Sequence, residues 1–311
     1  MDGLLNVSSN PHIRSKQTTS SIMLLVIISL LPAAGHAIYR FGFNALMLIG
    51  VSVLSAVAFE LLFEMFTGRK NTVGDFSAIV TGLLLALNLP VKAPWWIPIV
   101  GSFFAIVVVK MLFGGLGQNF MNPALAARCF LLISFTSIMT NFDTDTMSGA
   151  TPLYRIKMGE QVDIVKMLTG NTQGTIGETS AICLLIGAVF LFLCGVIDLI
   201  IPGMYIATFV ICIGLFGGHG FDPTFLSAHV LGGGLILGAF FMATDYVTRP
   251  ISKSGQVIFG MLLGILTAVF RVFGPTAEGV SYAIIIGNIL VPLIDKLTVP
   301  AYFGKGAVKS E

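Results

Sequence analysis

The residues best suited to chemistry form a polar segment between two hydrophobic blocks, which reads Asp145-Thr146-Met147-Ser148-Gly149-Ala150-Thr151. Threonine is a weak nucleophile, but another enzyme can link a phosphoryl group to its hydroxyl by aligning and deprotonating it. Such an enzyme needs an exposed, flexible acceptor, and Gly149 and Ala150 add almost no side-chain bulk. Pro152 disfavours the helical conformation at Thr151 and favours an extended one that docks in a cleft. The segment predicts Thr151 as a phosphoryl acceptor; the alternative is a polar turn of small residues.

The composition places this segment in a membrane protein. Of the 311 residues, 55% are hydrophobic and 10% are charged, whereas a soluble domain has about 25% charged residues. A chain with so few charges cannot cover its surface in water, but it can face lipid. The net charge of +2, without a basic tract, argues against nucleic acid as a partner. The four cysteines lie in apolar segments without metal-ligand spacing, which indicates small core residues.

Ten apolar segments are candidates for helices that cross the bilayer, which takes about 20 residues each. The third has polar residues at both ends and is expected to be partly broken. The segments run approximately over 21–39, 42–66, 73–90, 95–113, 121–140, 179–198, 200–216, 226–243, 255–273 and 280–297. The predicted fold is an all-α polytopic membrane protein.

A short sequence pattern that occurs twice suggests that the ten helices form two inverted five-helix repeats. Gly114-Gly115-Leu116-Gly117 precedes Asn122-Pro123, and Gly217-Gly218-His219-Gly220 precedes Asp222-Pro223. Halves with an odd number of crossings run in opposite orientations, and inverted repeats place binding sites near the repeat interface. The alternative is chance similarity in a glycine-rich chain.

The positions of lysine and arginine predict the topology. With the N-terminus in the cytoplasm, more of these residues fall inside than outside, as the positive-inside rule requires. Both termini are then cytoplasmic, and the long loop emerges on the outer face. The predicted divisions are an N-terminal segment, a first membrane half, the outer loop, a second membrane half and a C-terminal tail, at 1–20, 21–140, 141–178, 179–297 and 298–311.

The segment Asp145-x-x-Ser148-Gly149-Ala150-Thr151 resembles the acceptor motif of membrane flavin-transferase substrates. From about residue 8 to 297 the chain also resembles the family of D subunits of Rnf electron-transport complexes. That resemblance rests on Asn10-Pro11-His12-Ile13, Gly114 to Arg128, Phe241-Met242-Ala243-Thr244-Asp245, Glu278-Gly279-Val280-Ser281-Tyr282-Ala283 and Val291-Pro292-Leu293-Ile294-Asp295. Tyr246 departs from the family, which has proline there, and this leaves the shape of that turn open.

The resemblance implies a role in electron transfer. In this family a flavin transferase recognises Asp145, Ser148, Gly149 and Ala150 and moves FMN from FAD onto the threonine at position 151. The complex couples electron transfer between ferredoxin and NAD to movement of sodium ions or protons. This subunit would exchange electrons with a flavin-bearing G-type subunit, beside membrane subunits of the A, C and E types. It would be part of a translocase in the inner membrane of a bacterium, without a complete active site of its own.

Related proteins bind a second, non-covalent flavin such as riboflavin among the helices. The resemblance carries this site to Asn119 and Asn122, because amide groups can donate to and accept from the pyrimidine edge of a flavin. Polar groups at that depth need partners. The alternative is that both asparagines cap a helix beside Pro123.

Several ionisable residues stand next to apolar runs, where they are costly and often functional. They are Glu60, Glu64, Asp75, Asp198, Asp245 and Asp295. A solvated or helix-capping carboxylate is the expected role for most of them. Asp245, with Thr244, is a candidate for an ion pathway. Arg128 is expected to pair with either a flavin phosphate or a carboxylate.

Two rivals remain from the sequence. A stand-alone solute channel or transporter also uses inverted repeats and glycine-rich broken helices, but it has no use for a flavin acceptor. The B subunit of the sodium-translocating NADH:quinone oxidoreductase shares the acceptor motif. That subunit has a longer N-terminal extension, so the short N-terminus here favours the Rnf family.

Overall fold

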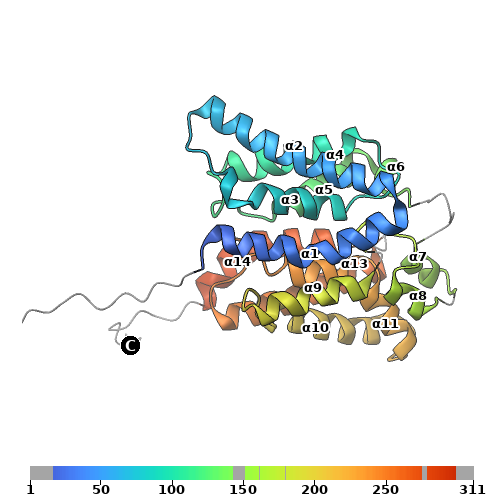
Figure 1. Ribbon diagram of the computed structural model, residues 1–311. Coiled ribbons are helices and arrows are strands. Elements are labelled where there is room, and N and C mark those ends of the chain that lie inside the picture. The colour runs from blue at the N-terminus through green and yellow to red at the C-terminus, as the bar shows by residue number, and fades with distance from the viewer. Residues whose placement is uncertain (1–16, 143–150, 161, 179, 275–278, 299–311) are drawn as a thin grey trace, which may run out of the picture.

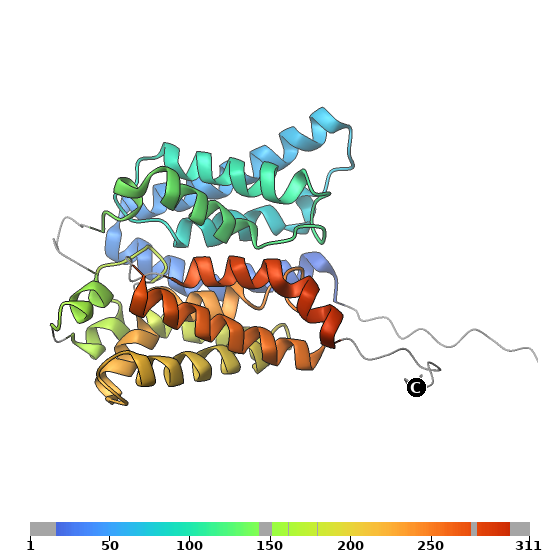
Figure 2. The same ribbon diagram turned by 180° about the vertical axis from the view of Figure 1, so that it is seen from behind.

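The computed structural model describes residues 17–142, 151–160, 162–178, 180–274 and 279–298 of the 311-residue chain. Within these ranges every regular element is a helix, and the long helices lie side by side in one bundle (Figure 1, Figure 2). The predicted outer-loop motif, with Asp145, Ser148, Gly149 and Ala150, lies outside the described residues. Thr151 is described.

The first half of the chain forms two long helices followed by shorter ones. Its elements are α1 (Thr19–Phe41), α2 (Phe43–Thr67), the 3₁₀ turn η1 (Val73–Asp75), α3 (Ser77–Leu87), α4 (Trp96–Phe103), the π-helix η2 (Phe104–Met111), α5 (Pro123–Ser134) and α6 (Thr136–Met139). The π-helix continues α4 directly, so these two form one apolar rod.

Two short helices, α7 (Pro152–Lys157) and α8 (Ile164–Thr169), precede the second half. Its elements are α9 (Ala181–Leu193), α10 (Ile200–Phe216), α11 (Pro223–Leu231), α12 (Leu235–Leu237), the π-helix η3 (Gly238–Met242), α13 (Lys253–Phe273) and α14 (Val280–Thr298). Helices therefore occupy each of the ten apolar segments that the sequence predicts.

The prediction of an all-helical, multi-pass protein is confirmed. However, not all of the ten predicted segments form helices long enough to cross a membrane. Among the described residues, α1, α2, α13 and α14 are long and apolar enough to span a membrane, and α11 with α12–η3 gives a fifth, bent by 61°. The other five apolar rods have 10–17 residues. At 1.5 Å per residue, the 11 residues of α3 cover about 16 Å of a hydrocarbon core about 30 Å thick.

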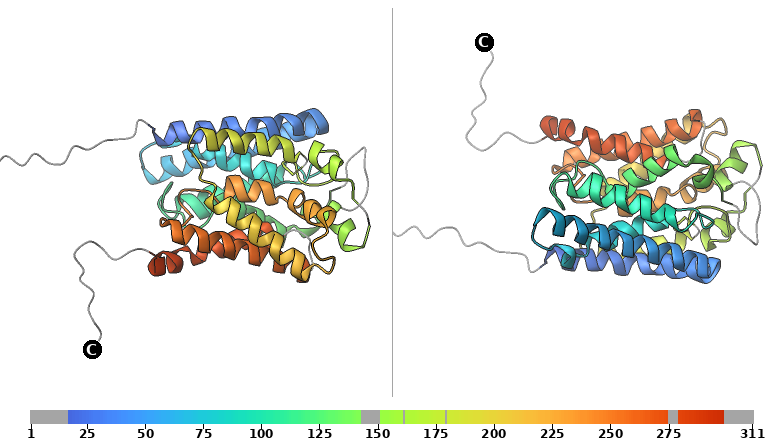
Figure 3. Two further views of the ribbon diagram at one scale, coloured as in Figure 1. Left: turned by 90° about the horizontal axis from the view of Figure 1, so that it is seen from below. Right: turned by 90° about the horizontal axis from the view of Figure 1, so that it is seen from above.

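The bundle has two distinct ends. The start of α1 and the end of α14 lie together at one end, here called the entry end, while α7 and α8 lie at the opposite end, called the loop end (Figure 1, Figure 3). The first helices of the two halves, α1 and α9, pack against each other in opposite directions, and α5 contacts α14. Matching helices thus meet between the halves.

The two copies of the glycine-rich sequence pattern do not precede equivalent helices of the two predicted repeats. Asn122 caps α5, the fifth rod, whereas Asp222 caps α11, the eighth. In both cases the side-chain oxygen accepts from the backbone of the first turn, and proline occupies the first helical position. The repeated pattern is therefore a shared signal for starting a helix.

Small residues allow α13 to pack closely against α10. A side chain at Gly260 or Gly264 of α13 would lie 2.8 Å from atoms of α10. Helices that pack in a lipid environment gain from such close approach, because contact between them replaces contact with lipid. Around this interior, large apolar residues such as Leu54 and Phe66 of α2 face outward, with 71% and 87% of their surface exposed, as expected for a lipid-facing surface.

Candidate functional site

Thr151 lies at the loop end, at the start of α7. Its side chain is partly exposed, and its hydroxyl oxygen makes one long contact, accepting from the Tyr154 backbone N–H at 3.4 Å. Pro152 occupies the first helical position, and Thr151 is extended, with φ −59° and ψ 154°. The extended conformation predicted from the proline is confirmed, and among the described residues the hydroxyl has this one weak partner.

A small cavity of about 300 Å³ adjoins Thr151. Its other walls come from Leu153 of the same helix α7, from Met167 of α8, and from Gly232 and Gly233 at the break between α11 and α12. Glu178 also lines it and forms an ion pair with Arg128 of α5 at 3.6 Å. Of the two partners expected for Arg128, the structure shows a carboxylate.

The Glu178 side chain reaches Arg128 because its segment pairs with the end of α3. Ile176 N donates to Leu89 O at 2.9 Å, and Gly177 N donates to Leu87 O at 2.7 Å. Arg128 also donates to the Asn88 side chain at 2.7 Å. These bonds tie the segment after α8 to the first half, so they hold the cavity beside Thr151 in place.

Glycines create the break that forms the far wall. Gly233 and Gly234 have φ angles of +64° and +67°, a region that disfavours other residues. The freed carbonyls at the end of α11 are satisfied by Arg271 of α13, which donates to the carbonyls of His229, Gly232 and Gly233. The broken helix is thus stabilised by a buried guanidinium rather than by a continued hydrogen-bond ladder.

A larger cavity of about 780 Å³ lies at the entry end, between the two halves. Both π-helices contribute to its wall, and π-helical turns are frequent at functional sites. Its polar lining brings together the residues that the sequence marked separately, namely Asn119, Asn122, Thr244 and Asp245, together with Ser77, Thr81, Lys110 and Tyr246.

The two asparagines differ in their free bonding capacity. Asn122 caps α5: its side-chain oxygen accepts from Ala124 N and Leu125 N at 3.1 and 3.3 Å. The capping alternative is therefore confirmed for Asn122. Asn119 is only 5% exposed and donates to Met121 O, while its side-chain oxygen has no partner among the described residues. A buried amide oxygen facing a cavity without a partner fits a ligand that donates a hydrogen bond.

Asp245 lies in the turn after η3, at the wall of the same cavity. Its carboxylate accepts from Val247 N at 3.4 Å and from the Thr248 hydroxyl at 3.2 Å. Burial raises the pKa of the Asp245 carboxyl, and these two hydrogen bonds, with the charge of Arg249, oppose that rise in pKa. Tyr246, the departure from the family pattern, contacts the cavity too, and its hydroxyl donates to Val196 O.

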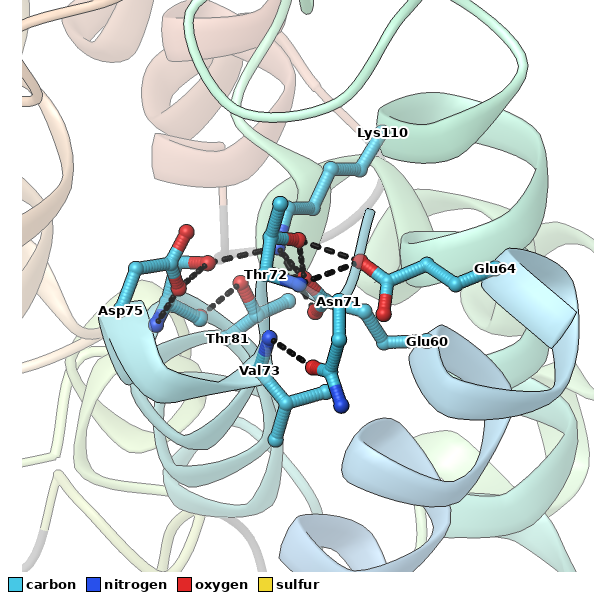
Figure 4. Close-up of polar contacts among 9 residues, drawn as sticks. Glu60, Glu64, Asn71, Thr72, Val73, Asp75, Thr81 and Lys110 are labelled. Atoms are coloured by element: carbon cyan, nitrogen blue, oxygen red, sulfur yellow. Dashed lines mark hydrogen bonds and ion pairs between the residues drawn. The ribbon is translucent and has the colours of Figure 1, made fainter. Parts of the chain in front are cut away.

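Two carboxylates expected to be solvated at a helix end are buried instead. Glu60 and Glu64 of α2 are 0% and 3% exposed. Glu60 accepts two hydrogen bonds from Lys110, at 2.8 and 2.9 Å, and Lys110 is itself 2% exposed (Figure 4). The helix-end role does hold for Asp75, which accepts from Ser77 N at 2.7 Å. A lysine inside the apolar run 104–112 was the sequence signal for this buried pair.

Comparisons with known proteins point in one direction. A model described as the NQR2, RnfD, RnfE family matches residues 6–304. The chain is 47% identical to the D subunit of the Na⁺-translocating ferredoxin:NAD⁺ oxidoreductase complex of Acetobacterium woodii, over 99% of this chain and 98% of that one. It is 39% identical to the D subunit of the proton-translocating ferredoxin:NAD⁺ oxidoreductase complex of Clostridium ljungdahlii, over 97% and 96%. It is 34% identical to the D subunit of the ion-translocating oxidoreductase complex of Salmonella paratyphi A, over 97% and 99%.

Proposed function

The chain belongs to the NQR2, RnfD, RnfE family, and from this premise we propose that it carries FMN, covalently linked to Thr151, as the D-type subunit of an ion-translocating ferredoxin:NAD⁺ oxidoreductase. The observation that best supports covalent attachment of FMN is the position and environment of Thr151. It ends the acceptor motif, is partly exposed, and has a hydroxyl with one weak internal contact. The test is a fluorescent flavin adduct on this subunit that is absent from a Thr151→Ala variant.

The residues at the loop end fit such a group. A phosphodiester on the Thr151 oxygen displaces only the 3.4 Å contact to Tyr154 N, and it leaves the rest of the flavin free beside the cavity. When bound, FMN supplies the electron chemistry, and the protein supplies position and electrostatics. Here Pro152 fixes the acceptor in its extended form, while the Arg128–Glu178 pair and the Arg271-capped break hold the surrounding wall.

We assign the loop end to the outer face of the membrane and the entry end to the cytoplasm. The support is the distribution of lysine and arginine in the sequence, together with the placement of α7 opposite the start of α1 and the end of α14. In this orientation Thr151 faces the flavin-bearing G-type subunit, and the apolar flanks of the bundle face lipid and the A-, C- and E-type subunits. The five-plus-five inverted repeat is part of the same proposal.

The cavity at the entry end is the proposed site of a second, non-covalent flavin. Asn119 carries this assignment, because its buried side-chain oxygen lacks a partner among the described residues. Asn122 contributes mainly by capping α5 beside it. The two flavins would then lie at opposite ends of the bundle, which suits a chain that moves electrons across a membrane.

Replacing Asn119 with leucine should weaken the binding of acid-releasable flavin about tenfold and so lower its content in the purified complex. A lost hydrogen bond that leaves its ligand partner unsatisfied costs about 1–3 kcal/mol, and about 1.4 kcal/mol corresponds to tenfold in affinity. The control is Asn171→Leu, at an exposed asparagine of the loop end. Equal flavin content in both variants and the wild type would remove Asn119 from the site.

Asp245, with Thr244, is proposed to lie on the ion pathway, since both line the cavity. Asparagine at position 245 keeps one oxygen for Val247 N, and its NH₂ group can donate to the Thr248 hydroxyl oxygen, so the turn should persist while the titratable charge is lost. We expect Asp245→Asn to reduce ion uptake per electron several-fold in reconstituted vesicles. Unchanged uptake with normal electron transfer would exclude this residue from the pathway.

The cavity and the broken helix α11–α12 are also what a solute transporter would show. A flavin adduct on Thr151 separates the two functions, because a transporter has no use for it. The quinone-reductase alternative within the family differs in its electron acceptor. Co-purified subunits and a comparison of NAD-linked with quinone-linked activity decide between these two.

A further inference from the structure

A buried group of charged side chains lies at the entry end, where α2, η2 and the η1–α3 turn meet (Figure 4). It contains the carboxylates of Glu60, Glu64 and Asp75 and the ammonium of Lys110. If all four were ionised, three negative charges and one positive charge would give a net charge of −2. Asp75 is partly exposed and Lys110 neutralises Glu60, so the uncompensated charge falls on Glu64, which is 3% exposed.

The arginine that follows α2 in sequence forms no ion pair with Glu64 among the described contacts. Arg69, in the connection between α2 and η1, donates to Met111 O and lies over the Phe63 ring. An ionised carboxylate buried without a partner is strongly unfavourable, and it takes up a proton or another cation instead. Glu64 therefore needs a compensating positive charge that no described side chain provides.

The contacts of Thr72 show where a proton is missing. Its hydroxyl oxygen lies 2.5 Å from a Glu64 oxygen and 3.0 Å from a Glu60 oxygen. A hydroxyl has one hydrogen, and ionised carboxylates only accept, so at most one of these two contacts has a hydrogen of its own. A second hydrogen, carried by a carboxyl group, satisfies the arrangement.

Lys110 determines which carboxyl carries that hydrogen. Its ammonium uses its three hydrogens on both Glu60 oxygens and on the Ser77 hydroxyl, the last at 2.6 Å, so both Glu60 oxygens act as acceptors. Glu64 has no such donor: one of its oxygens accepts from Thr72 N, and the other is buried without a partner among the described residues. We propose that Glu64 is an exchangeable proton-binding site, connected through Thr72, Glu60, Lys110 and Ser77 to the entry-end cavity.

The position of this group of charged side chains suits the exchange of a proton at Glu64. Thr72 is exposed at the surface of the entry end and covers Glu64, while Lys110 and Ser77 line the cavity on the other side. Thr72, at the surface, thus contacts both buried carboxyl groups, and the hydrogen bonds continue from Glu60 through Lys110 to Ser77 at the cavity. One relative of this chain is named for translocating Na⁺ and another for translocating protons. The cation that Glu64 holds would therefore distinguish a role of this subunit in proton translocation from a role in Na⁺ translocation.

Infrared spectroscopy of the purified complex in lipid nanodiscs tests this proposal. At pH 7 the wild type should show a carbonyl band of a protonated carboxylic acid, and Glu64→Gln should lose it. Glutamine keeps the shape and can donate to Thr72, so the variant should fold. Asp75→Asn is the matched control, because Asp75 belongs to the same group and acts only as an acceptor of two hydrogen bonds from Ser77; the band should remain.

A second variant protects the test against misfolding of the first. Thr72→Val, at an exposed position, removes the hydroxyl partner and should shift the frequency of the band without abolishing it. Transfer into D₂O should shift the band as well, since the proton exchanges. A spectrum of Glu64→Gln identical to that of the wild type would overturn the proposal. A loss of the wild-type band that saturates with added Na⁺ would support the exchange, because it would show that Na⁺ displaces the proton from Glu64.

Discussion

Replacing Thr151 with alanine should abolish covalent flavin on this subunit and reduce ferredoxin-dependent NAD reduction by the complex to background. The substitution removes the side-chain oxygen to which the flavin would be linked. The structural cost is small, because the hydroxyl makes one 3.4 Å cap contact to Tyr154 N and loss of such a cap costs about 0.5–2 kcal/mol. The measurement is the rate of NAD reduction by the purified complex, with subunit content checked on the same sample.

A threonine on the same cavity provides the control. Thr172 lines the wall beside Thr151 but stands outside the acceptor motif, so Thr172→Ala should keep both the flavin and the activity. Normal activity of Thr151→Ala in a complex with full subunit content would show that electrons do not pass through a group on this residue. Loss of activity in both variants would indicate damage to the fold of the loop end instead.

Replacing Lys110 with methionine should lower the stability of the protein by about 3–5 kcal/mol, because removing one partner of a buried ion pair leaves an uncompensated charge. The side chain is 2% exposed and its ammonium lies 2.8 Å from Glu60, which is fully buried. The measurement is the thermal unfolding of the purified protein in detergent, followed by tryptophan fluorescence or circular dichroism.

The double variant Lys110→Met with Glu60→Gln separates the charge from the packing. Replacing both members of a buried pair with uncharged groups of similar volume is often nearly neutral, so most of the lost stability should return. A loss of less than about 1 kcal/mol in the single variant would contradict a buried, ionised pair. A double variant as unstable as the single one would place the effect in packing rather than in charge.

Composition and hydrophobic length predicted the membrane class and the positions of the helices, because burial in lipid requires long apolar runs. They did not predict that α3 has only 11 residues or that the eighth rod bends by 61°. The short length of α3 depends on a segment far along the chain, which pairs with the end of α3 through Ile176 and Gly177. The bend between α11 and α12 depends on Arg271, which donates hydrogen bonds to the carbonyls at the break.

The candidate site was predictable in part. The motif around Thr151 is local, so sequence alone identified it, and Pro152 fixed the conformation that the structure shows. The contact between Glu60 and Lys110 joins residues 50 positions apart, and the spacing of Glu60 and Glu64 on one helix face gave no indication of the partner. The different roles of Asn119 and Asn122 likewise required coordinates, because a capping asparagine and a ligand asparagine look the same in sequence.

The central claim is the covalent flavin on Thr151, and the intact mass of the subunit tests it most directly. The chain should be produced with and without a flavin transferase, beside Thr151→Ala, and each sample weighed and viewed for fluorescence in a denaturing gel. The account predicts a mass increase of one FMN, and a fluorescent band, only for the wild type produced with an active transferase. An unmodified wild type in that sample, with another substrate of the same transferase modified, would contradict the electron-carrier function proposed for this chain.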